Sequence, residues 1–210
     1  MTEELEEYIL SHTDKESPYL KELYRATNIN LLNGRMASGH LQGRLLKIMV
    51  EMIRPRNILE VGTFSGYSAI CMAEGLEEGG KLYTFEANDE IEDFTRAWIN
   101  GSDQADKIKF LIGDAMDEAP KLGVEFDMVF IDGDKRRYSD IYEMAMNLTS
   151  PNAFILVDNT LWDGHVVDHS YDRDRQTEGI REFNDLVAKD ERVEKLILPL
   201  RDGLTIIRKK

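Results

Sequence analysis

Two continuous apolar runs, each followed by oxygen-bearing side chains, constrain the fold of this chain more than any other feature. Residues 128–131 and 154–157 are typical of strands buried on both faces of a parallel sheet. The first run is followed by Asp132, and the second by Asp158 and Asn159. The carboxyl ends of parallel strands form the edge at which open α/β sheets bind ligands. If the two strands are neighbours, three hard oxygen ligands suited to Mg²⁺ or Ca²⁺ converge there.

The rest of the chain alternates between strand-like and helix-like segments, which predicts a doubly wound α/β sheet. Residues 1–54 have a helical pattern whose apolar stripe stops at Pro55, so we expect an N-terminal helical extension followed by a sheet domain over 55–210, in one compact unit. An Asp-Gly turn in residues 200–203 predicts that the final strand runs antiparallel. We expect strands over residues 58–61, 81–85, 108–112, 127–131, 154–157, 193–199 and 204–208.

The composition is that of an ordinary globular protein with an acidic balance. Forty acidic and 26 basic residues give a net charge of −14, which opposes non-specific binding to nucleic acid or to an anionic membrane. The acidic N-terminus does not resemble a secretory signal, and no apolar stretch approaches the roughly 20 residues that span a bilayer. The single cysteine, Cys71, lies in an apolar helical pattern and is expected to be inert packing. These features predict a cytoplasmic protein.

A glycine-containing turn after the first predicted strand indicates a cofactor loop. Residues 59–68 end a strand and begin a helix, the position of a Rossmann-type nucleotide loop. Phe64 stands where the dinucleotide fingerprint needs its second glycine, which argues against NAD or FAD. Glu86 ends the next strand, 20 residues after Gly66, the distance at which an acid commonly binds ribose hydroxyls. We therefore expect a nucleoside cofactor without a diphosphate.

At these residues the sequence resembles the cation-dependent class I O-methyltransferases of the caffeoyl-CoA and catechol O-methyltransferase type, which use S-adenosylmethionine (SAM). The resemblance extends from about Met36 to the C-terminus. It rests on the ordered motifs LEVGTFSGYSA at 59–69, the strand-ending Glu86, IGDA at 112–115, FIDGDKRRY at 130–138, VDNTLWDG at 157–164, IREFN at 180–184 and LPLRDGLTIIRKK at 198–210. It implies a Rossmann-like methyltransferase sheet.

Carried over by position, the resemblance also implies a set of site residues. SAM would be held by Ser38, Glu60, Gly62, Thr63, Ser68, Glu86, Ala115 and Asp134. The cation ligands would be Asp132, Asp158 and Asn159, and the catalytic lysine would be Lys135. The resemblance further implies a homodimer.

The acceptor side of the predicted site departs from the family pattern at one position. Where plant caffeoyl-CoA members carry an asparagine that contacts substrate, this chain has Asp163, which disfavours an acyl-CoA with its many phosphates. The neighbouring Trp162 is either a core residue or a wall for a flat aromatic ring. We therefore expect a small phenolic acceptor.

The chemistry of methyl transfer agrees with these residues. Displacement at a sulfonium is in line, so an enzyme must present an oxyanion at close range and align it. A hard cation such as Mg²⁺, Mn²⁺ or Ca²⁺ does both if two vicinal hydroxyls chelate it. Lys135, about one helical turn from Asp132, would remove the proton, since a lysine near a dication is driven toward its neutral form.

Three hypotheses follow from the sequence. The first is a cation-dependent O-methyltransferase acting on a catechol-like or hydroxylated phenolic acceptor, and the third is a non-catalytic SAM-binding protein. The second is a methyltransferase that modifies hydroxyuridine in tRNA, which the net charge disfavours but does not exclude. Local phosphate contacts for tRNA would come from Arg136, Arg137, Arg173 and Arg175.

Overall fold

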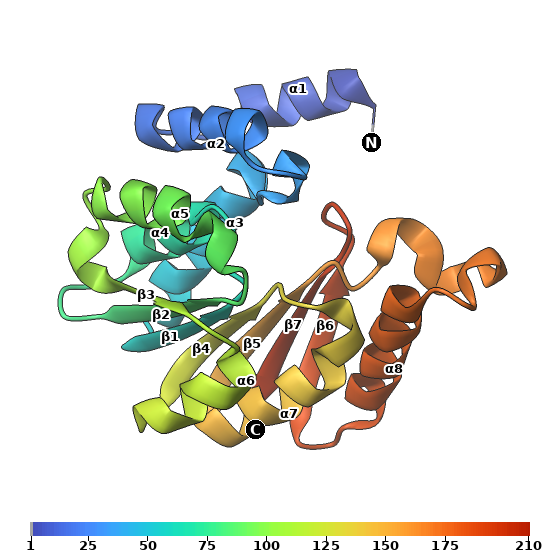
Figure 1. Cartoon of the computed structure of the whole chain (residues 1–210). Helices are drawn as coiled ribbons and strands as arrows, with labels where there is room; N and C mark the ends of the chain where they lie inside the picture. The colour runs from blue at the N-terminus through green and yellow to red at the C-terminus, as the bar shows by residue number, and fades with distance from the viewer. Residues whose placement is uncertain (1) are drawn as a thin grey trace.

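A seven-stranded sheet forms the centre of the computed structural model, which describes residues 2–210 (Figure 1). The strands are β1 (Asn57–Val61), β2 (Lys81–Glu86), β3 (Ile108–Ile112), β4 (Phe126–Ile131), β5 (Thr149–Asp158), β6 (Val193–Leu198) and β7 (Leu204–Lys209). Their order is β3-β2-β1-β4-β5-β7-β6. Strands β1 to β5 are parallel, whereas β7 is antiparallel to both β5 and β6. The predicted α/β sheet with an antiparallel C-terminal strand is confirmed.

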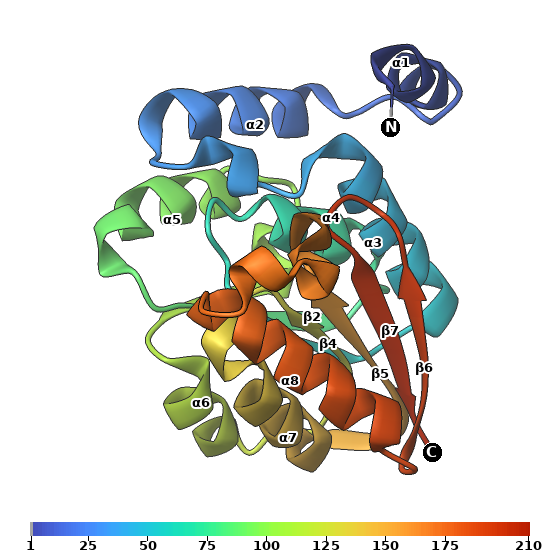
Figure 2. The same ribbon diagram turned by 90° about the vertical axis from the view of Figure 1, so that its right-hand side faces the viewer.

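Helices cover both faces of this sheet. The α-helices of the described chain are α1 (Glu3–Ser11), α2 (Pro18–Asn30), α3 (Gly39–Ile53), α4 (Tyr67–Gly75), α5 (Glu92–Asn100), α6 (Ala115–Glu118), α7 (Tyr138–Leu148) and α8 (Arg175–Lys189). Helices α6, α7 and α8 lie on one face, and α3, α4 and α5 lie on the other (Figure 2). None of the helices in residues 2–210 has the length and apolar character needed to cross a bilayer.

The strand period of two divides the core between the two faces. Leu59 and Val61 of β1 belong to the cluster under α7 and α8, whereas Ile58 belongs to the cluster under α3 and α4. Glu60 therefore points to the α3 and α4 face, beside its register partner Thr84 on β2. Alternation thus places one acidic side chain deep below the loop that follows β1.

The N-terminal segment joins the body through α2 and α3. Leu20 and Leu23 of α2 belong to the same buried cluster as Leu46 of α3, and the Tyr19 hydroxyl donates to the Trp98 carbonyl over 2.5 Å. Helix α1 lies outside this packing, at the edge of the molecule (Figures 1 and 2). The extension is therefore anchored at α2 and α3.

Cys71 is a packing residue of α4. Its side chain is buried, and burial raises the pKa of its thiol well above the usual value. A Cβ built on Gly43 of α3 would lie 2.6 Å from the Cys71 Sγ, so the two helices cross at close range there. This environment suits an unreactive thiol.

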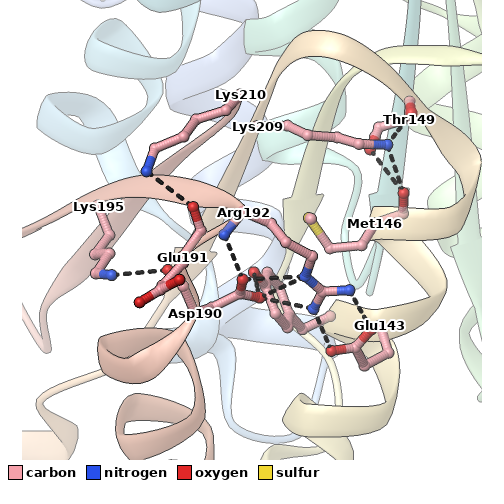
Figure 3. A network of polar contacts seen from close by, with 10 residues as sticks. Glu143, Met146, Thr149, Asp190, Glu191, Arg192, Lys195, Lys209 and Lys210 are labelled. Atoms are coloured by element: carbon pink, nitrogen blue, oxygen red, sulfur yellow. Dashed lines mark hydrogen bonds and ion pairs between the residues drawn. The ribbon is translucent and has the colours of Figure 1, made fainter.

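Ion pairs fasten the edge strand β6 to the body (Figure 3). Asp190, after α8, accepts from the Arg192 guanidinium at 2.6 Å, and the same group bonds Glu143 of α7 at 2.6 Å. The Tyr142 hydroxyl also donates to Asp190 over 2.8 Å. These donors, Arg192 first, hold the pKa of Asp190 well below its usual range. Lys209 adds bonds to two backbone carbonyls, at the end of α7 and the start of β5.

Candidate active site

The carboxyl ends of β1, β4 and β5 meet at one edge of the sheet. Val61 pairs with Ile131, and Ile131 pairs with Val157, so the residues that follow the three strands emerge together. The backbone N–H of Asp132 donates to the Val61 carbonyl over 2.8 Å and carries the β1 and β4 pairing one step beyond the strands. The order of the chain reverses between β1 and β4, which makes this edge a topological switch point.

Gly62 allows the loop after β1 to pass close to the end of β4. Its φ of +97° lies in a region that favours glycine, and a Cβ built there would be 2.2 Å from the Asp132 carbonyl oxygen. Gly66, with a φ of +84°, precedes the first residue of α4. The glycines predicted from sequence are therefore required by the backbone path of this loop.

Below the loop, Glu60 is completely buried. The Ser68 hydroxyl donates to Oε1 and the Thr84 hydroxyl to Oε2, each over 2.5 Å. Burial raises the pKa of Glu60 to about 8, although these two hydrogen bonds oppose the shift. Glu60 thus supports the loop from beneath, and its carboxyl oxygens are already engaged by hydroxyl groups.

Glu86 stands behind the loop at the end of β2. Its Oε2 accepts the backbone N–H of Phe64 over 2.8 Å, and its Oε1 accepts that of Asn88 over 2.9 Å. Each carboxylate oxygen has a second lone pair left for a ligand. The two backbone N–H groups therefore fix the orientation of the Glu86 side chain, and both of its carboxylate oxygens can still accept a hydrogen bond from a ligand.

A small pocket opens between this loop and the segment that precedes α3. Its lining residues are Met36, Ala37, Ser38, Gly62, Thr63, Phe64, Ser65, Tyr67, Ser68 and Asp132. Four predicted cofactor residues, Ser38, Gly62, Thr63 and Ser68, are among them. Ser65 is also among them, and its buried hydroxyl has no hydrogen-bond partner within the described chain.

Ala115 and Asp134, the other predicted cofactor residues, begin elements beside the site. Ala115 is the first residue of α6, and Asp134 caps the 3-10 turn Lys135–Arg137. Asp134 is paired with Arg136 at 2.5 Å, and Arg137 is paired with Asp114 at 2.5 Å. Both ion pairs lie in half-exposed positions and give this part of the site a defined shape.

The predicted cation ligands occupy the ends of β4 and β5. Asp158 is 4% exposed; its Oδ2 accepts from the Gln42 side chain over 2.7 Å, and its Oδ1 from the Asn159 backbone N–H over 2.9 Å. Burial and the Asp132 carboxylate raise the pKa of Asp158 to about 6. Among the side chains that the structure describes, no three of the types His, Cys, Asp and Glu lie together as a metal-binding group, so the third predicted ligand here is an amide. The neighbouring carboxylates of Asp132 and Asp158, with the amide of Asn159 next in the chain, are the ligand types that suit a hard dication.

Lys135 is buried beside these acids. Its Nζ lies 2.7 Å from Asp132 Oδ1, 5.3 Å from the centre of the Tyr138 ring and 5.8 Å from that of Trp162. Burial opposes the charged form, but the Asp132 carboxylate and Tyr138 outweigh it and raise the pKa of Lys135. In this geometry the Asp132 carboxylate stabilises the protonated form of Lys135, whereas the expectation of a neutral lysine concerns a site that holds a dication. Its use as a base requires that Asp132 be engaged elsewhere.

Trp162 and Asp163 form the loop after β5. Trp162 is half-buried against the cluster under α7 and α8, and the centre of its ring lies 5.8 Å from the Lys135 Nζ. Both residues have left-handed backbone, with φ values of 47° and 50°. Asp163 is exposed.

Sequence reasoning missed three residues of this region: Gln42, Ser65 and Arg201. Gln42 is 1% exposed within the first turns of α3, so a polar residue inside an apolar stripe was the available signal. Arg201 reaches the start of α3 from the β6 and β7 hairpin. No pattern in the sequence indicates that contact.

Comparison with known proteins identifies the class to which this fold and site belong. The O-methyltransferase family model matches residues 10–210. A caffeoyl-CoA O-methyltransferase of Stellaria longipes is 30% identical, in an alignment that covers 99% of this chain and 91% of that protein. A catechol O-methyltransferase of Niastella koreensis is 32% identical, and its alignment covers 76% of this chain and 73% of that protein. An O-methyltransferase from Bacillus cereus, solved in complex with SAH, superposes with a TM-score of 0.90 at 30% identity, covering 98% of this chain and 97% of that one.

The fold is therefore that of the class I SAM-dependent methyltransferases. Within this class, the chain belongs to the O-methyltransferase family. It is a SAM-dependent O-methyltransferase, and the resemblance stated from its motifs is confirmed.

Proposed function

We propose that the chain methylates one hydroxyl of a small catechol-like or hydroxylated phenolic molecule, with a divalent cation held by Asp132, Asp158 and Asn159. The observation that carries this proposal is the pair of neighbouring carboxylates, Asp132 just after β4 and Asp158 at the end of β5, beside the buried amine of Lys135. Asp132 also lines the pocket beside Gly62 and Thr63, so one of the two acids borders the proposed cofactor site.

We propose that SAM binds to residues of the loop between β1 and α4 and of the segments next to that loop. Ser38, Thr63 and Ser68 line the pocket, and the anchored carboxylate of Glu86 suits a ribose diol. SAM, when bound, supplies a methyl group on a sulfonium. Glu60 would act from below through the Ser68 hydroxyl, and Ala115 and Asp134, at the starts of α6 and of the 3-10 turn Lys135–Arg137, would add further contacts.

For the cation, Mg²⁺ is our first candidate and Mn²⁺ or Ca²⁺ the alternatives. When bound, it supplies positive charge that lowers the pKa of a coordinated hydroxyl. Asp132 and Asp158 balance that charge, and Asn159 adds an oxygen without adding charge. With Asp132 holding a cation, its carboxylate would stabilise the Lys135 ammonium less, and Lys135 would then be able to accept the proton of the acceptor hydroxyl.

The acceptor class follows from the walls of the cleft. Trp162 presents an aromatic face beside Lys135, which suits a flat ring. The exposed carboxylate of Asp163 and the net charge of −14 disfavour an acceptor that carries several phosphates. The relatives named above act, by their names, on caffeoyl-CoA and catechol, and the second kind of acceptor agrees better with these charges.

The experiment that tests the proposal is methyl transfer from labelled SAM to a catechol panel and to undermodified tRNA, each with Mg²⁺ and with excess EDTA. We expect turnover of catechols with Mg²⁺, loss of that turnover with EDTA, and nearly unchanged SAM binding by calorimetry, because Glu86 and the metal ligands lie on different strands. Full activity in EDTA would remove the cation from the mechanism. Methylation of tRNA alone would establish the alternative, which is weakened because Arg136 and Arg137 already pair with acids.

We also propose that the chain forms a homodimer. Large apolar side chains are exposed on α3, where Ile48 is 43% and Met52 76% exposed, and on β6, where Leu196 is 55% exposed. We expect sedimentation analysis to give the mass of two chains and Met52→Glu to shift the mass toward one. A single-chain mass for the unaltered protein at tens of micromolar, roughly the range in which weak dimers still form, would contradict this.

A further inference from the structure

Hydrogen bonds between polar side chains connect the tip of the β6 and β7 hairpin with the proposed cation site. Gln42, near the start of α3, donates from Nε2 to Asp158 Oδ2 over 2.7 Å. Its Oε1 accepts a hydrogen bond from Arg201 Nη1 over 3.2 Å. The same Arg201 nitrogen donates to the backbone carbonyls of Ala37, over 3.2 Å, and Ser38. The hairpin tip therefore contacts one wall of the cofactor pocket and, through Gln42, the cation ligand on β5.

Arg201 determines which way the Gln42 amide points. A guanidinium has only donors, so the amide atom that faces it must be the carbonyl oxygen. The NH₂ group must then face the Asp158 carboxylate, which can only accept when it is ionised. The reverse orientation would set donor against donor at one end and acceptor against acceptor at the other. The hydrogen bond from Arg201 to Gln42 and the hydrogen bond from Gln42 to Asp158 therefore require the same orientation of the amide.

Two features of the hydrogen-bonded set Arg201, Gln42 and Asp158 are unfavourable for the free energy of folding by themselves. Gln42 is 1% exposed, and burial of an amide is unfavourable unless its hydrogen bonds are made. Arg201 has a φ of 49°, in the left-handed region that favours glycine. Such arrangements persist where the surrounding structure needs them, most often at functional sites.

We propose that Gln42 is a positioning residue for the cation ligand Asp158, and that Arg201 holds Gln42 in this role. The inference rests on the proposed function, because Asp158 matters in this way only if the site binds a cation. The hydrogen bond to Oδ2 restricts rotation of the carboxylate, so less freedom is lost when a cation is bound. Gln42 itself is not a ligand in this proposal and does not contact the acceptor.

The test is the affinity of the full chain for Mn²⁺ alone, measured by electron paramagnetic resonance of the free ion. Gln42→Leu keeps the volume but removes the donor, and we expect Mn²⁺ binding to weaken about 10- to 100-fold, the usual effect of losing an outer-sphere partner. SAM affinity by calorimetry should stay near that of the unaltered protein. The matched control is Gln104→Leu, a half-buried glutamine just before β3, at the opposite edge of the sheet. It should leave both affinities unchanged.

Arg201→Met keeps the stem and removes all donors. We expect weaker Mn²⁺ binding, because Gln42 is then free to turn, together with weaker SAM binding, because the carbonyls of residues 37 and 38 lose their partner. If Arg201 acts on the cation through Gln42, the double variant binds Mn²⁺ no more weakly than Gln42→Leu does. Additive weakening would overturn that link.

Asp158→Ala separates this inference from the proposed function. If it binds Mn²⁺ as tightly as the unaltered chain, or if the unaltered chain binds none, the cation site is wrong and the inference falls with it. If Asp158→Ala loses Mn²⁺ but Gln42→Leu binds it normally, the cation site stands and only the positioning role of Gln42 is overturned. A general loss of structure in Gln42→Leu would lower SAM and Mn²⁺ affinity together, which also counts against a specific role.

Discussion

Replacing Lys135 by methionine should lower kcat by about 10²- to 10⁴-fold, the range lost with a general base, while SAM affinity stays nearly unchanged. Methionine keeps much of the stem between the Tyr138 and Trp162 rings but removes the amine. Raising the pH should recover part of the loss, because solvent then deprotonates the chelated hydroxyl. Initial rates on a catechol acceptor across pH, with calorimetry for SAM, give both quantities.

The matched control is Lys109→Met. Its Nζ also lies over a tyrosine ring, 4.8 Å from the centre of Tyr83, but on β3, away from the cleft. It should keep the kcat of the unaltered enzyme. If Lys135→Met also keeps that kcat near neutral pH, the cation alone suffices for deprotonation and Lys135 has only a positioning role.

The Lys135→Met variant also tests whether a dication can replace the Lys135 amine as the charge partner of Asp132. Removing the amine leaves this partly buried carboxylate without its 2.7 Å partner, so the variant should be less stable without a cation. Added Mg²⁺ should restore more stability to Lys135→Met than to the unaltered chain, because the dication supplies the missing positive charge. Thermal unfolding with and without Mg²⁺ measures this difference.

Strands buried on both faces were the part of the fold most accessible to sequence reasoning. The runs 128–131 and 154–157 lie within β4 and β5 and are buried except for the half-buried Phe154, because a central parallel strand needs continuous apolar residues. The observed β5 nevertheless begins at Thr149, five residues earlier than predicted. Its first residues include exposed positions and Pro151, which apolar patterning cannot distinguish from a loop.

Long-range polar contacts of the site were not accessible in this way. Gln42 and Arg201 are separated by 159 positions, and their contact depends on how α3 and the hairpin pack. The protonation state of Lys135 depends on whether Asp132 is free, which no local pattern records. Trp162 was predicted as core or as a wall for a flat ring; it packs partly against the core, and its contact with an acceptor stays a prediction.

Gly62→Ala should cost about 2 to 5 kcal/mol of unfolding free energy, the sum of a left-handed backbone with a Cβ and of overpacking. The added methyl would lie 2.2 Å from the Asp132 carbonyl oxygen, a backbone atom that cannot turn away. The end of β4 must therefore shift, and both SAM and Mn²⁺ affinities should fall with stability. Urea unfolding and the two binding measurements test this together.

Gly79→Ala is the control that isolates the close approach of the two strand ends. Gly79 has a φ of +82°, similar in sign to that of Gly62, but a Cβ built there meets no atom within 4 Å. Gly79→Ala should lower the unfolding free energy only by the backbone cost of about 1 to 2 kcal/mol. The affinities for SAM and Mn²⁺ should stay unchanged. If both variants lose the same stability and Gly62→Ala still binds SAM and Mn²⁺ normally, the cleft tolerates a wider separation of β1 and β4. The contact between Gly62 and Asp132 would then be a consequence of the fold with no part in shaping the site.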